Sequence, residues 1–168
     1  MATFITADLP IIHMPVLYLV EGERLYTCLG PFSLGSSSGA DLRVDSPHVA
    51  DRHLRFYHDE GWCVRPFENP APPIQPATLN GQPLRSSSFL HPGDTLTLGL
   101  NTVLEVPRRG YLVPTEYRSD DVCRLMISIA TEGRWEELAV VADALEDAGC
   151  TDAKVLALLR NNTVIAGD

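Results

Sequence analysis

The feature that most constrains the fold of this chain is a series of short apolar segments between residues 16 and 106, which are separated from one another by turn-forming residues. Seven such segments of four to seven residues read as strands: VLYLV, LYTCLG, DLRV, HLRFYH, GWCVRPF, DTLTLG and TVLEV. Gly, Pro, Asn and Asp cluster between them, as in EGER, HDEG, LNGQ and HPGD. Many short strands at close spacing predict two packed β-sheets, or a barrel, over residues 15–106.

After residue 118 the spacing of apolar residues changes from that of strands to that of helices. We expect helices at about 119–132, 134–148 and 151–160, with Ser119 and Thr151 as N-caps and Gly133 and Gly149 at the ends of the first two. The expected organisation is an N-terminal extension (1–14), a β-sandwich (15–106), a linker (107–118) and a helical C-terminal region (119–168). The fold class is thus mainly β with an appendage of about three helices.

The segment Glu68–Ala77 interrupts the strand pattern with four prolines in ten residues. Proline lacks a backbone donor for a sheet, so we expect an extended surface loop here.

Composition excludes several classes of function. The net charge of −9 disfavours nucleic acid and anionic membranes, because binding to phosphates is driven by Lys and Arg. No apolar run is long enough to span a bilayer, and the N-terminus does not have the pattern of a signal peptide. Four cysteines without a CxxC pair are expected to be free thiols in a reducing cytoplasm. We therefore expect a cytoplasmic protein without metal or cofactor.

An ordered set of short motifs between Val16 and Val106 resembles the forkhead-associated (FHA) domain. The motifs are LG at Leu34–Gly35, ADL at Ala40–Leu42, Val49 with His53, LNG at Leu79–Gly81, and LHPGDTLTLG ending at Gly99. The resemblance implies a β-sandwich whose loops at one end bind phosphothreonine peptides. It also implies that Gly35, His53 and Gly81 support those loops. The segment from Glu137 to Asn162 resembles a short helical module found at the ends of many bacterial proteins.

The residues that would grip a phosphate in that family are different here. The family's Arg after the glycine is replaced by Ser36, its phosphate-contacting Ser by Ala50, with Asp51 beside it, and its NGT turn would fall on Gln75–Ala77. A phosphate carries about −1.5 to −2 charges and is held best by charge-assisted hydrogen bonds. The candidate ligand-loop residues are therefore an altered set: Ser36, Ser37, Ser38, Ala50, Asp51, Arg52 and Asn80.

Three functions remain open from the sequence. The first is a non-enzymatic adaptor that binds an unmodified protein partner of unknown identity. The second is a phosphothreonine-peptide reader that uses Arg43, Arg52 or Arg55 in place of the missing Arg. The third is a small hydrolase, in which a serine from the run at 36–38 or 86–88 would act together with His48 or His53. The sequence has no GxSxG motif to support it.

The apolar stripes of the three expected helices need a partner surface, because about fifty residues seldom form a stable core alone. They either dock on the sandwich or bury apolar surface against another protein. Trp135 and Leu138 are the candidate residues for such a partner surface.

Overall fold

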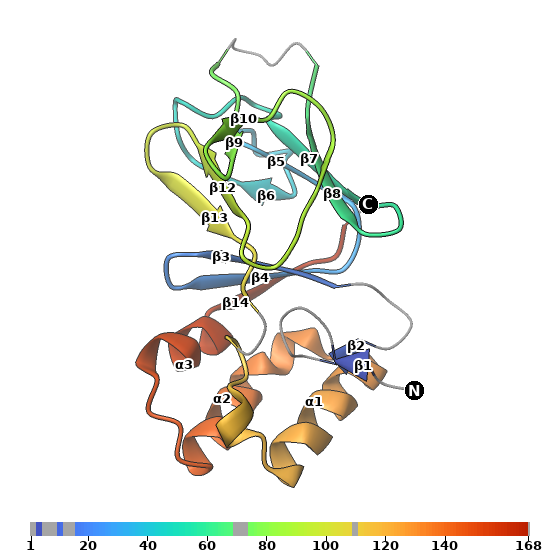
Figure 1. Ribbon diagram of the computed structural model, residues 1–168, viewed down its shortest axis with the longest axis vertical. Coiled ribbons are helices and arrows are strands. Elements are labelled where there is room, and N and C mark those ends of the chain that lie inside the picture. The colour runs from blue at the N-terminus through green and yellow to red at the C-terminus, as the bar shows by residue number, and fades with distance from the viewer. Residues whose placement is uncertain (1–2, 5–9, 12–15, 69–73, 109–110, 168) are drawn as a thin grey trace.

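The computed structural model describes residues 3–4, 10–11, 16–68, 74–108 and 111–167. Two β-sheets pack into a sandwich, and three helices lie against the outer side of one sheet (Figure 1). The predicted fold class, mainly β with a β-sandwich and a helical C-terminal part, is confirmed. Of the proline-rich segment, residues 69–73 lie outside the described residues, and residues 74–77 lead without regular structure into the next strand.

The larger sheet has seven strands in the order β10-β9-β12-β13-β3-β4-β14. Its neighbours are antiparallel except for β4 and β14, which are parallel. The strands are β3 (Leu17–Glu21), β4 (Arg24–Cys28), β9 (Thr78–Leu79), β10 (Gln82–Pro83), β12 (Thr95–Leu98), β13 (Thr102–Glu105) and β14 (Asn162–Ile165).

The smaller sheet has five strands in the order β11-β8-β7-β5-β6, with β5 and β6 parallel. The strands are β5 (Phe32–Gly35), β6 (Leu42–Arg43), β7 (Leu54–His58), β8 (Trp62–Pro66) and β11 (Ser88–Phe89). A separate hairpin of β1 (Thr3–Phe4) and β2 (Pro10–Ile11) lies beside the first helix.

The three helices are α1 (Asp120–Glu132), α2 (Leu138–Asp147) and α3 (Ala153–Arg160). Ser119 caps α1 by accepting from the Val122 amide, and Gly133 ends it with a left-handed backbone. A 3₁₀ turn, Trp135–Glu137, precedes α2. The cap of α3 is Asp152 and not the expected Thr151, because the Asp152 carboxylate accepts from the Lys154 and Val155 amides.

Strand β14 follows α3 and was missed by the sequence analysis, which expected only helices in this region. It pairs in register with β4, from Asn162 opposite Leu25 to Ile165 opposite Cys28. Asn162 ties three parts of the fold together, since its side chain accepts from the Thr27 hydroxyl at 2.6 Å and donates to the Trp135 carbonyl at 3.0 Å. The last segment of the chain is therefore a structural part of the larger sheet.

Strand β3 divides its side chains between two apolar cores. Leu17 and Leu19 face the sandwich interior, where Phe32 and Phe56 stack at a centroid distance of 4.5 Å. Tyr18 and Val20 point to the other side and pack with the helices. A strand that is buried on both faces reads as a continuous apolar run, and VLYLV is such a run.

The helices thus dock on the sandwich and share its outer core. The Tyr18 ring meets Trp135 edge-on at a centroid distance of 6.3 Å, and residues of all three helices complete the cluster. Figure 1 shows α2 and α3 beneath β3, β4 and β14. Within the described part of the chain, every helix is too short or too polar to cross a bilayer.

Candidate functional site

The loops at one end of the smaller sheet carry most of the candidate ligand-loop residues. The β5–β6 loop holds Ser36–Ser38 and the β6–β7 loop holds Ala50, Asp51 and Arg52. Backbone hydrogen bonds join the two loops: Ser36 donates to the Ala50 carbonyl at 2.9 Å and Ser37 to the Asp51 carbonyl at 3.3 Å. The candidate residues on these two loops are therefore brought together as one surface.

Gly35 allows this close approach of the two loops. A Cβ atom placed there would lie 1.9 Å from the Asp51 carbonyl oxygen, far inside van der Waals contact. No other residue fits without a backbone shift, which gives a physical reason for the glycine at this position.

His53 supports the β6–β7 loop through a buried hydrogen bond. Its ring is only 5% exposed, and its Nδ1 accepts a hydrogen bond from the Ala50 amide at 3.0 Å. Its own backbone amide donates to the Leu34 carbonyl at 2.8 Å. Burial lowers the pKa of the His53 imidazole, so the ring is neutral with its proton on Nε2. This arrangement supports a loop rather than a proton transfer.

The two altered phosphate positions offer little to an anion. Ala50 is completely buried, so its methyl group is not available to a ligand. Ser36 is half-buried and uncharged, and the neighbouring Asp51 is exposed with a negative charge. The Ser37 hydroxyl already accepts from the Gly39 amide at 3.1 Å.

Arg43 is a cation in direct contact with Ser36. This contact follows from the pairing of Gly35 with Arg43 in the parallel β5–β6 ladder. Its Nε donates to the Ser36 carbonyl at 3.1 Å, and its Nη2 lies 3.8 Å from the Asp45 carboxylate. Arg43 is therefore positioned beside the altered site, although it is partly neutralised by Asp45.

Asn80 and Gly81 form the tight turn between β9 and β10, and both have positive φ. The Asn80 side chain donates to the Asp94 carboxylate at 3.0 Å and accepts from the Thr95 amide at 2.9 Å. These bonds hold the loop before β12, so the polar atoms of Asn80 are used within the fold.

A polar pocket of about 420 Å³ lies beside the two ligand loops, on the outer face of the smaller sheet. It is lined by Ser33, Gly39, Asp41, Arg52, Arg55, Arg65 and Phe67. Sequence reasoning had named Arg52 and Arg55 but missed Arg65 and Asp41. The alternation of β8, in which Val64 is buried and Arg65 exposed, could have placed Arg65 on the outer face.

Trp135 and Leu138 do not form a partner surface, and this expectation was wrong. They are 5% and 1% exposed and belong to the core between the helices and the larger sheet. The helical stripe is covered by the sandwich itself, because β3 and β4 present the apolar side chains Tyr18, Val20 and Leu25 to it.

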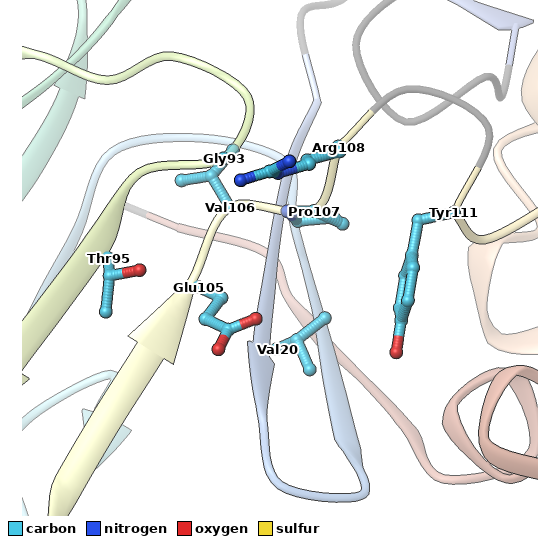
Figure 2. A pocket seen from close by; sticks show the side chains of 8 residues that line it. All are labelled: Val20, Gly93, Thr95, Glu105, Val106, Pro107, Arg108 and Tyr111. Carbon is cyan, nitrogen blue, oxygen red and sulfur yellow. The ribbon is translucent and has the colours of Figure 1, made fainter.

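A second pocket, of about 250 Å³, lies where the sandwich continues into the segment before the helices (Figure 2). Arg108 extends across Gly93, and the Tyr111 ring and the Glu105 carboxylate lie to either side of Val20. Glu105 and Arg108 carry opposite charges, so the pocket has no dominant sign. Among the described residues, no three His, Cys, Asp or Glu side chains are grouped to hold a metal ion.

Residues 32–99 match the family model of the FHA domain. The predicted resemblance is confirmed. An FHA domain from an Arabidopsis thaliana hypothetical protein has a TM-score of 0.50 and 20% identity, and the match covers 57% of this chain and 87% of that one.

Two further solved structures are similar over a comparable share of the chain. The Synechocystis sp. Slr1951 protein has a TM-score of 0.49 at 17% identity, covering 56% of this chain and 96% of that one. The first FHA domain of Mycobacterium tuberculosis Rv1747 has a TM-score of 0.46 at 20% identity, covering 56% and 99%. No curated protein matches the chain by sequence.

Proposed function

We propose that this protein is a non-enzymatic adaptor that binds an unmodified protein segment at the loop end of its FHA-like sandwich. The observation that carries the proposal is the pair of altered positions on the joined loops. Ala50 is fully buried and Ser36 is neutral, so neither supplies a charge-assisted hydrogen bond to a phosphate. Each such bond is worth about 1.5–3 kcal/mol, so their loss removes most of the reason to prefer a phosphorylated segment.

The charge at the loop end supports the same proposal. Asp51 is exposed beside the altered positions and repels a dianion. The frame is nevertheless kept by Gly35, by the two interloop backbone bonds and by the His53–Ala50 hydrogen bond. A rigid loop surface without a phosphate grip suits a partner segment that is recognised by shape and neutral hydrogen bonds.

Arg43 favours the second candidate function, a phosphothreonine-peptide reader. Its guanidinium lies against the Ser36 carbonyl, and its side chain is 55% exposed, so it stands beside the position where the family has its Arg. The adaptor proposal predicts that neither the parent protein nor Arg43→Gln shows phosphate-dependent binding. The second candidate predicts that the parent shows such binding and that Arg43→Gln abolishes it.

The test is a calorimetric titration of the full chain with phosphothreonine peptides and with the same peptides unphosphorylated. We expect no phosphate-dependent binding tighter than a Kd of about 1 mM, near −4 kcal/mol. A micromolar Kd that disappears on dephosphorylation and on Arg43→Gln, but not on Arg124→Gln, would refute the adaptor proposal. Arg124 is a suitable control because it is an exposed arginine on α1.

The complementary variant restores the family residues, Ser36→Arg together with Ala50→Ser. Because the loop frame is intact, we expect this variant to gain measurable affinity for phosphothreonine peptides. Partner capture from the native host, with and without phosphatase treatment, should give the same partner in both samples.

A further inference from the structure

The geometry points to a second recognition element: the pocket lined by Arg52, Arg55 and Arg65 takes the carboxylate groups of an acidic segment in the protein partner. This inference rests on the proposed function, since it assumes an unmodified protein partner at the loop end. It assigns a ligand chemistry to a face of the sandwich outside the altered phosphate positions.

Strand register gathers the pocket's central residues. Ser33 on β5 pairs with Arg55 on β7, and Arg55 pairs with Arg65 on β8. Directly paired residues share a face of a sheet. The residues flanking this row, such as Leu54 and Val64, are fully buried in the sandwich, so the row itself is on the outer face.

The third arginine comes from a ligand loop. Arg52 is exposed at the end of the β6–β7 loop, immediately after Asp51, and lines the same pocket. Gly39, from the β5–β6 loop, forms another part of the wall. A segment that lies across the loop end can therefore place a side chain into the pocket while its backbone remains on the loops.

The lining is cationic within an acidic protein. Three arginines and one acidic residue, Asp41, line the pocket, in a chain whose net charge is −9. Among the described residues, neither Arg52 nor Arg65 makes an ion pair, and Arg65 lies 5.9 Å from the centroid of the Phe67 ring. Packing against a ring limits the side-chain freedom that Arg65 would lose on binding a ligand.

The polar groups of the pocket suit a carboxylate, and the proposed function, with its unmodified partner, makes an acidic side chain the occupant. The Asp41 carboxylate remains in the pocket because it accepts from the Ser33 amide at 2.9 Å and from the Ser33 hydroxyl at 3.4 Å. A guanidinium fork also matches a planar carboxylate with two parallel hydrogen bonds.

The experiment uses the full chain and capped ten-residue peptides in which Glu alternates with Gly, with Gln replacing Glu in the control peptide. Calorimetry at low salt should show binding of the Glu peptide at least tenfold tighter than binding of the Gln peptide. The double variant Arg52→Gln, Arg65→Gln should lose at least tenfold of the affinity for the Glu peptide. Arg124→Gln should retain it, which separates the pocket from the general effect of removing a positive charge.

Equal binding of the two peptides, or unchanged binding by the double variant, would overturn the inference. A Glu peptide in which one residue is replaced by phosphothreonine supplies the competing anion. If it bound at least tenfold tighter than the Glu peptide, and this gain vanished in the double variant, the carboxylate assignment would be overturned in favour of phosphate.

Because both arginines are exposed, we expect each variant to remain folded, and thermal melts check this. Failure of the proposed function is distinguishable, since it appears in the phosphothreonine titrations as binding that depends on Arg43 and not on Arg52 or Arg65.

Discussion

The two outer faces of the sandwich differ in chemistry: one is apolar and covered by helices, and the other is polar. The outer face of β3 and β4, in the larger sheet, presents Tyr18, Val20 and Leu25 and is covered by helices. The outer face of the smaller sheet presents a row of Ser33, Arg55 and Arg65 and carries a polar pocket. No helix among the described residues packs on this second face, which we call the bare face. Under the proposed function the covered face contributes stability, and the bare face contributes recognition together with the adjoining loops.

The largest expected effect is on the covered face. Trp135→Ala removes a ring that is 5% exposed and packs edge-on against Tyr18, so we expect a loss of about 3–5 kcal/mol in the free energy of unfolding. Urea denaturation followed by circular dichroism measures it.

Arg65→Gln on the bare face is the matched comparison for Trp135→Ala. An exposed surface residue away from tight packing usually changes stability by less than about 0.5 kcal/mol. If the two substitutions destabilised the protein equally, the proposed division between a stabilising face and a recognition face would be wrong.

An intermediate effect is expected where the bare face meets the ligand loops. Gly35→Ala forces a Cβ atom against the Asp51 carbonyl, so we expect destabilisation by about 1–3 kcal/mol and loss of ligand-loop order. Gly39→Ala is the control, because a Cβ there meets only the Ser37 hydroxyl at 3.6 Å. Amide exchange at Ser36 and Ser37 should speed up in the first variant alone; similar exchange in both would show that the close approach does not hold the loops.

The smallest expected effect is the pH dependence due to His53. Burial lowers its pKa below the ordinary value of 6.5, so the unfolded chain takes up a proton before the folded protein does as the pH falls. The stability that neutral His53 contributes is therefore fully present above pH 6.5 and is lost as the pH falls through the lowered pKa.

Chemical denaturation between pH 5 and 8 measures this effect in the parent protein and in His53→Gln. The variant should have the shallower pH dependence. A His53→Gln profile parallel to the parent would mean that another group carries the pH dependence.

Much of the sandwich could be predicted because its signals are local. Turn residues and alternating apolar runs marked the strands, and Ser119 and Gly133 marked both ends of α1. The residues expected to support the candidate site, Gly35, His53 and Gly81, came instead from the family resemblance, which is carried by short motifs.

The features that sequence reasoning missed depend on contacts between distant segments. Strand β14 has only four residues, NTVI, and becomes a strand because β4 offers it an open edge. The burial of Trp135 follows from the outer side chains of β3, about 115 residues earlier in the chain. The arginine pocket likewise requires the register of three strands, which no single segment encodes.

The position of β14 late in the sequence determines when the larger sheet can be completed during synthesis. The hydrogen bond from Thr27 to Asn162 joins residues that are 135 positions apart. A ribosome adding about 5–20 residues per second needs roughly 7–27 seconds between them. Throughout that interval β4 has a vacant edge, and until the helices emerge the apolar side of β3 has no cover. The nascent sandwich therefore keeps an exposed strand edge until β14 has left the ribosome, and pairing of β14 with β4 removes that edge as a site of aggregation.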